Sequence, residues 1–161
     1  MQKHQASQEV EIIDYTPQYQ EAFRKLNEEW ISTYFKMEEL DYRSLGNPQG
    51  YIIDKGGHIF VALYRGEPVG VCALIKMNDP TYDYELGKMA VSPKVQGKSI
   101  GWLLGKAIIE KAKSLGGRNL YLESNTMLTP AINLYYKLGF TKVEDRQSPY
   151  ERSDIQMELI F

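Results

Sequence analysis

The chain has 161 residues and a formal net charge of −2, with 19 lysines and arginines against 21 aspartates and glutamates. This length fits one domain that can bury a substantial core, so we expect a single domain over residues 1–161 with its core from about residue 9. Because the chain has no basic excess, nucleic acid is excluded as its main partner.

Cys72 is the only cysteine, which excludes an internal disulfide and a CxxC metal site. It lies in the apolar run V-G-V-C-A-L-I, which predicts a buried structural thiol. The first residues, M-Q-K-H-Q-A-S-Q, lack the apolar segment of a signal peptide. No run reaches membrane-spanning length, so we expect a cytoplasmic protein without a membrane partner.

The first third of the chain predicts a strand and two helices. Residues 9–14 alternate in polarity as a strand does, and residues 17–34 carry apolar side chains at helical spacing. These apolar positions are Tyr19, Phe23, Leu26 and Trp30. Pro17 suits the first helical turn. A second short helix is expected over residues 37–45, before Asn47-Pro48 breaks the pattern.

The middle of the chain predicts an antiparallel meander. Residues 58–64 and 68–77 are β-rich runs joined by the turn signal R-G-E-P, which indicates a hairpin. Residues 82–91 form a third run, reached by another short connection. Three strands in succession should therefore pair antiparallel.

The rest of the chain predicts a parallel crossover and a closing hairpin. A helical stripe over residues 100–115 stops at Gly116-Gly117, and a strand follows over residues 119–123. Strand, helix and strand make one right-handed crossover. Another helix is expected over residues 130–138, and residues 140–146 should pair with residues 155–161 across a long loop.

The stretch E-L-G-K-M-A-V-S-P-K-V-Q-G-K-S-I-G, residues 85–101, joins a strand to a helix through a Gly-rich turn. Such a turn presents free backbone N–H groups beside the positive end of the helix. A phosphate or pyrophosphate suits this environment. The string Gly97-Lys98-Ser99 also permits a P-loop reading, but that motif needs a glycine at position 92, which is Ser92, and Pro93 follows it.

Two motifs indicate a family. The string from Gln96 to Gly101, preceded by V-S-P, resembles the acetyl-CoA signature [QR]-x-x-G-x-[GA] of the GNAT N-acetyltransferase superfamily. The segment A-I-N-L-Y-Y-K-L-G-F, residues 131–140, resembles its second signature, and the spacing between them fits. The resemblance covers residues 9–161. It implies a mixed α/β fold: a largely antiparallel twisted sheet of about seven strands, flanked by about four helices.

The resemblance also implies a cofactor site for acetyl-CoA. Backbone amides of the turn would bind the pyrophosphate, and the preceding strand end would pair with the pantetheine arm. The residues expected to bind the cofactor are Met89, Ala90, Val91, Gln96, Gly97, Lys98, Ser99, Ile100, Gly101 and Asn125. Ser99 replaces the central glycine of the signature. A serine can keep its N–H in place and cap the helix, provided that φ stays negative.

The chemistry of acetyl transfer indicates which catalytic groups to expect. A lysine-like amine has a pKa of about 10.4, so at pH 7.4 only ~0.1% is neutral, a cost of roughly 4 kcal/mol. A general base therefore helps. The resemblance implies Glu85 as that base, with Glu123 as a weaker alternative, and a backbone N–H at residues 89–91 for the oxyanion. Tyr135 matches the tyrosine of the second signature and is the expected acid.

The acceptor is expected to enter between the first helices and the loop after Phe140, where Trp30, Tyr34 and Phe35 are the substrate candidates. No His, Cys and carboxylate cluster indicates a metal. We therefore predict an N-acetyltransferase acting directly on a primary amine of a small molecule or peptide in a ternary complex, as a monomer or homodimer. The alternative is a non-catalytic CoA-binding regulatory module.

Overall fold

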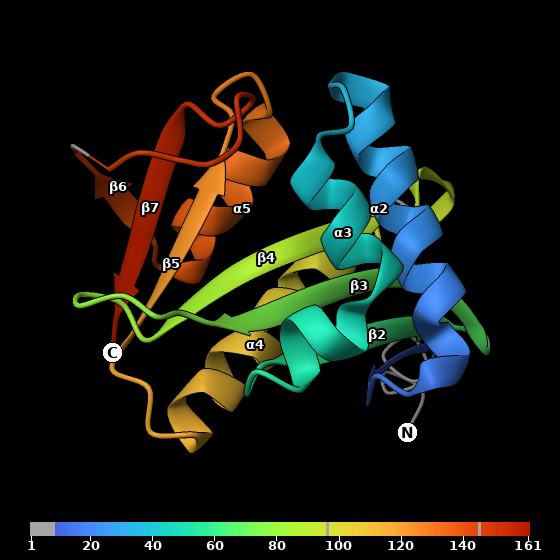
Figure 1. The fold of residues 1–161 in the computed structure, drawn as a ribbon. Coiled ribbons are helices and arrows are strands. Elements are labelled where there is room, and N and C mark those ends of the chain that lie inside the picture. The colour runs from blue at the N-terminus through green and yellow to red at the C-terminus, as the bar shows by residue number, and fades with distance from the viewer. Residues whose placement is uncertain (1–8, 96, 145) are drawn as a thin grey trace.

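A computed structural model describes residues 9–95, 97–144 and 146–161. The described residues form one seven-stranded sheet in the order β1-β2-β3-β4-β5-β7-β6 (Figure 1). The strands are β1 (Val10–Asp14), β2 (His58–Tyr64), β3 (Glu67–Lys76), β4 (Tyr84–Val91), β5 (Asn119–Ser124), β6 (Thr141–Val143) and β7 (Ile155–Ile160). Only β4 and β5 pair in parallel, which confirms the predicted meander and the predicted crossover.

The predicted α-helices are all present, with additional short segments between them. The α-helices are α2 (Gln20–Tyr34), α3 (Glu39–Gly46), α4 (Ile100–Ser114) and α5 (Thr129–Leu138). The short helical segments are η1 (Pro17–Tyr19), η2 (Gln49–Ile53) and η3 (Pro93–Val95). Pro17 opens η1 ahead of α2, rather than α2 itself. A capping box between Glu38 and Asp41 starts α3 two residues later than predicted.

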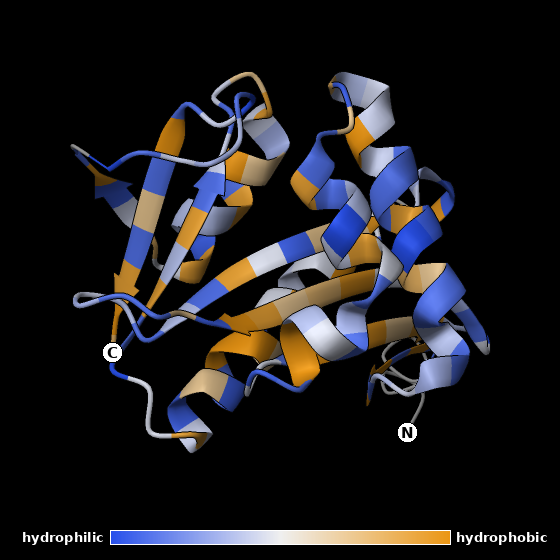
Figure 2. Cartoon of the chain, viewed as in Figure 1, coloured by the Kyte–Doolittle hydropathy of each residue, from blue (hydrophilic) through white to orange (hydrophobic). Residues whose placement is uncertain are grey.

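The sheet is covered on both faces, and β3 shows this most clearly. Val71 and Ala73 pack into a core under α2 and α3, whereas Cys72 and Leu74 pack into a second core under α4. Because strand side chains alternate between faces, a strand buried on both sides has a continuous apolar sequence. Figure 2 shows this hydrophobic strand beneath the hydrophilic outer surface of α2. Cys72 is fully buried, as predicted.

Strand β6 is shorter than the predicted run of residues 140–146. The Arg146 guanidinium donates to Asp79 at 3.0 Å and lies over the rings of Tyr82 and Tyr121. These contacts hold Arg146 against the loop between β3 and β4. Strand β6 therefore ends at Val143, shortly before the ion pair of Arg146 with Asp79, and strand periodicity alone does not predict this end.

Candidate active site

The site begins where strands β4 and β5 separate. Their parallel pairing is confined to Tyr84 with Leu120 and Glu85 with Tyr121. Beyond that point the two strands diverge (Figure 1), so the edge of β4 facing β5 has no partner strand among the described residues. Backbone N–H and C=O groups along this edge are consequently available to a ligand.

A β-bulge in β4 lies beside this opening. The register against β3 shifts between Val71 and Ala73, where two residue steps on β3 face three on β4. Lys88 takes up the extra residue with φ of 53°, the left-handed region that a lysine rarely adopts. Bulges of this kind bend a strand and redirect its side chains, and they are frequent next to active sites.

A large pocket of about 840 Å³ occupies the opening between the end of β4, the turn before α4, and α5. Eight of the expected cofactor residues line it: Met89, Ala90, Val91, Gly97, Lys98, Ser99, Ile100 and Gly101. Gln96 lies outside the described residues. The first-turn N–H groups of α4 have no acceptor within the helix, so this pocket presents hydrogen-bond donors and a partial positive charge. Its donors and volume fit the pyrophosphate and pantetheine parts of acetyl-CoA.

Glycine is required at two positions of this turn for different reasons. Gly97 has φ of +81°, which a residue with a side chain adopts only with strain. A Cβ at Gly101 would lie 3.0 Å from Leu134 of α5, so the glycine allows the two helices to approach closely. The turn and α5, which carry the two sequence motifs, are thereby joined in one pocket.

The expected backbone conformation of Ser99 is wrong. Its φ is +59°, and its side chain makes no capping hydrogen bond to α4. The serine therefore adopts the left-handed conformation that favours glycine, at a cost on the order of 1 kcal/mol. The backbone keeps the shape of the motif although the side chain does not suit it.

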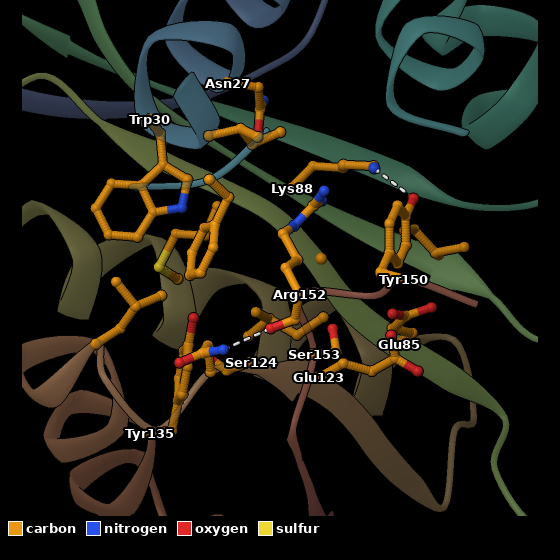
Figure 3. A pocket seen from close by; sticks show the side chains of 18 residues that line it. Asn27, Trp30, Glu85, Lys88, Glu123, Ser124, Tyr135, Tyr150, Arg152 and Ser153 are labelled. Atoms are coloured by element: carbon orange, nitrogen blue, oxygen red, sulfur yellow. Dashed lines mark hydrogen bonds between the residues drawn. The ribbon is translucent and has the colours of Figure 1, made fainter. Parts of the chain in front are cut away.

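A smaller cavity of about 160 Å³ adjoins the large pocket, and Figure 3 shows the side chains around it. Trp30, Met89 and Tyr135 line both spaces. The small cavity also receives residues from α2, β4, β5 and the loop before β7: Asn27, Phe35, Glu85, Lys88, Glu123, Asn125, Tyr150 and Arg152. A thioester in the large pocket and an amine in the small cavity would therefore meet beside Tyr135.

Tyr135 is well placed between the two spaces. It lies on α5, partly buried, with its ring edge-on to Phe140 at a centroid separation of 6.3 Å. Its hydroxyl has no hydrogen-bond partner among the described residues, so it can donate to a ligand. Burial raises the pKa of the Tyr135 phenol, and the nearby Cys72 thiol raises it further. Tyr135 therefore remains protonated at neutral pH.

Glu85 is partly buried and lines the small cavity. Burial raises the pKa of Glu85 to about 7, the Glu123 carboxylate raises it as well, and the Lys88 ammonium lowers it. A carboxylate with this pKa can accept a proton near neutral pH. Glu123 is held in place, because it accepts hydrogen bonds from Tyr121 at 3.0 Å and from Ser148 at 2.6 Å.

A buried ion-pair network, which the sequence did not indicate, forms another part of the wall of the small cavity. Asp41, fully buried on α3, accepts two hydrogen bonds from Arg152 at 2.6 and 2.7 Å. The Lys88 ammonium lies 3.5 Å from Asp41 and donates to the Tyr150 hydroxyl at 2.9 Å. Burial alone would raise the pKa of Asp41, but hydrogen bonds from Arg152 and Glu38 and the charge of Lys88 bring it below its usual value.

The other predicted site residues differ in which of the two spaces they line. Asn125 lines the small cavity rather than the large pocket, and its amide donates to the carbonyl of Arg152 at 2.7 Å. Trp30 and Phe35 line the small cavity, whereas Tyr34 is exposed and packs edge-on against Trp30 at 4.8 Å. Asn27 was missed, although a polar residue within the apolar stripe of α2 was a usable signal.

Two further features of the described residues bear on the class of protein. No group of three or more His, Cys, Asp or Glu side chains within them lies close enough to hold a metal ion. None of their helices is both long and apolar enough to cross a bilayer.

This architecture defines a class of α/β protein with two splayed parallel strands beside a helix N-terminus, a space whose shape suits an extended, pyrophosphate-bearing cofactor. A family model described as acetyltransferase (GNAT) family matches residues 15–140. The chain belongs to this family, which confirms the resemblance and the predicted fold class.

Relatives with curated names support the same family. The uncharacterized N-acetyltransferase YjgM of Escherichia coli is 33% identical over 95 residues, which cover 58% of this chain and 57% of YjgM. N-acetyltransferase 8 of Rattus norvegicus is 27% identical over 97 residues, and 44% of its length is covered. The chain therefore spans about half the length of these relatives.

Solved structures share the fold. An acetyltransferase of the GNAT family from Staphylococcus aureus Mu50 aligns with a TM-score of 0.84 and 20% identity, covering 94% of this chain and 98% of that one. The yncA protein of Salmonella typhimurium, solved with its cofactor acetyl-CoA, aligns with a TM-score of 0.74 and 18% identity, covering 94% of each chain.

Proposed function

We propose that this protein transfers the acetyl group of acetyl-CoA to a primary amine of a small molecule or peptide, by direct attack within a ternary complex. The observation that carries the proposal is the meeting of two spaces at Trp30, Met89 and Tyr135. One space offers backbone donors suited to pyrophosphate, and the other contains a carboxylate suited to an amine.

Acetyl-CoA supplies the thioester. The turn at residues 97–101 binds the pyrophosphate, and the unpaired edge of β4 at residues 89–91 holds the pantetheine arm and donates an N–H to the thioester carbonyl oxygen. When the amine nitrogen bonds to the acetyl carbon, the carbon–sulfur bond breaks. The amine loses one proton and the departing thiolate gains one, so the reaction is balanced.

Glu85 receives the proton of the amine. It precedes Met89 by four residues, which is about 13 Å of strand at about 3.3 Å per residue, so the proton passes through water rather than directly. Tyr135 donates a hydrogen bond to the thiolate. A thiol has a pKa near 8.5 and an unperturbed phenol a pKa near 10, and burial raises the pKa of Tyr135 further, so full proton transfer is uphill by at least roughly 2 kcal/mol and is completed as solvent enters.

The test is calorimetric titration with acetyl-CoA, followed by an assay of thiol release with a panel of monoamines, diamines, amino acids and peptides. We expect binding at sub-millimolar cofactor and turnover with at least one amine. Binding without any turnover would support the regulatory CoA-binding module instead, and no binding would refute both readings.

A further inference from the structure

The small cavity presents hydrogen-bond acceptors that lack donors of their own. Asn27, only 1% exposed, donates its amide group to the carbonyl of Phe23 at 3.0 Å. Its side-chain oxygen has no donor among the described residues and points into the cavity (Figure 3). Because no buried side-chain oxygen or nitrogen of the described residues lacks a hydrogen-bond partner, this oxygen is open to the cavity, where an N–H group of a ligand can reach it. The ligand of this cavity should therefore carry N–H groups.

Glu85 and Glu123 extend this acceptor surface away from Tyr135. Glu123 is fixed by the hydroxyls of Tyr121 and Ser148, and neither carboxylate forms an ion pair within the described residues. Both carboxylates also line a third cavity of about 370 Å³, whose wall includes Lys88 and Arg146, and Arg146 is paired with Asp79. An elongated ligand can therefore pass from Tyr135 alongside both carboxylates.

The cations of the cavity wall do not neutralise these two carboxylates. Arg152 pairs with Asp41 and Glu38, and Lys88 also lies within ion-pair distance of Asp41. Two positive and two negative groups thus balance within that network. Glu123, together with Glu85 when it is ionised, remains as the net negative charge of the cavity, which favours a cationic ligand.

We propose that the acceptor is a linear diamine, or a molecule carrying an ammonium group at a similar distance from its reacting amine, and that Glu123 binds the second cation beside Glu85. The inference rests on the proposed acetyl transfer. The strand from Glu85 to Met89 spans about 13 Å, and the glutamate side chains cover several ångströms of it. The remaining distance suits a chain of about four methylene groups between the two nitrogens.

Two acceptors of equal chain length test the proposal: 1,4-diaminobutane and butylamine. We expect kcat/KM for the diamine to exceed that for the monoamine by at least about tenfold, the equivalent of about 1.4 kcal/mol. This ratio should fall about tenfold in Glu123→Gln and should persist in Glu110→Gln, a matched change at an exposed site on α4. The diamine preference should also weaken as salt is added.

Three outcomes would overturn the proposal. Equal kcat/KM for diamine and monoamine in the unaltered protein would do so even if Glu123→Gln failed to fold. A preference for amino acids would show that Lys88 and Arg152 bind a carboxylate of the acceptor instead. Failure to bind acetyl-CoA and to release thiol with any amine would refute the acetyl transfer itself, and this inference with it.

Discussion

The two halves of the candidate active site are built differently. The large pocket is formed mainly by one short part of the chain, residues 89–91, 95 and 97–102, and by one helix, α5, and it offers mostly backbone groups. The small cavity is lined mainly by side chains from α2, β3, β4, β5, α5 and the loop before β7, and a network centred on Asp41 balances the charges of Lys88 and Arg152. A local backbone shape can be retained through sequence change, whereas a cavity assembled from distant side chains is free to vary in chemistry. The comparison leads to five predictions, from the largest expected effect to the smallest.

Removing Arg152 should destabilise the protein through the acceptor side and leave cofactor binding intact. Arg152→Met leaves the buried Asp41 with only Lys88 as a cation, so we expect the free energy of unfolding to fall by about 3 kcal/mol and the melting temperature by about 6–12 °C. Acetyl-CoA binding, measured well below the melting point, should persist. Arg24→Met, which removes two surface ion pairs on α2, is the control and should cost less than about 1 kcal/mol. Equal losses in the two variants would contradict the prediction.

Tyr135→Phe tests the point where the large pocket and the small cavity meet. Without the phenol the thiolate loses its hydrogen-bond donor, so we expect kcat to fall about 100-fold, while the calorimetric Kd for acetyl-CoA changes by less than about twofold. Tyr136→Phe changes an exposed neighbour and should leave kcat unaltered. If Tyr135→Phe retains full turnover, the proton reaches the thiolate by another route.

Glu85 should control the pH dependence of catalysis. The raised pKa of about 7 predicts that kcat/KM of the unaltered protein increases with pH up to about 7, as the carboxylate ionises. In Glu85→Gln this limb should disappear, with a loss of at least about tenfold at pH 8. An unchanged pH profile in the variant would exclude Glu85 as the base.

The same pKa has a consequence for stability. Because folding raises the pKa of Glu85, the folded state binds more protons, and stability is lost as pH rises from the unfolded value toward about 7. Glu85→Gln should therefore be more stable than the unaltered protein at pH 8, by about 1–3 kcal/mol, and nearly equal at pH 5. Thermal unfolding at both pH values, with Glu110→Gln as control, measures this difference.

Ser99→Gly should give the smallest effect, on the cofactor side. Glycine adopts the left-handed conformation of residue 99 without a Cβ clash, so we expect a gain of about 0.5–1 kcal/mol in the free energy of unfolding and a modestly tighter Kd for acetyl-CoA. Ser99→Ala removes the hydroxyl but keeps the Cβ, and it should give no gain. Equal behaviour of the two variants would show that the hydroxyl, not the backbone, decides this position.

Much of the fold followed from local patterns. The sequence predicts the apolar stripe of α4, the meander of β2 to β4 and the two motifs, because periodicity and turn chemistry act over a few residues. The early end of β6 was not predicted, since Arg146 just beyond it pairs with the distant Asp79. The segment η2 was not predicted either. For Ser99 the sequence suggested a cap, and the structure shows a strained turn instead.

The sequence by itself determined the family, the fold class and the turn that suits a pyrophosphate, because each depends on neighbouring residues in a fixed spacing. Only the tertiary structure brought Asn27, Lys88, Glu123 and Arg152 around one cavity. It also decided the protonation of Glu85, since its raised pKa depends on burial and on a carboxylate from another strand. Charge and solvation act through space rather than along the chain, so the surroundings of these side chains depend on the folded structure.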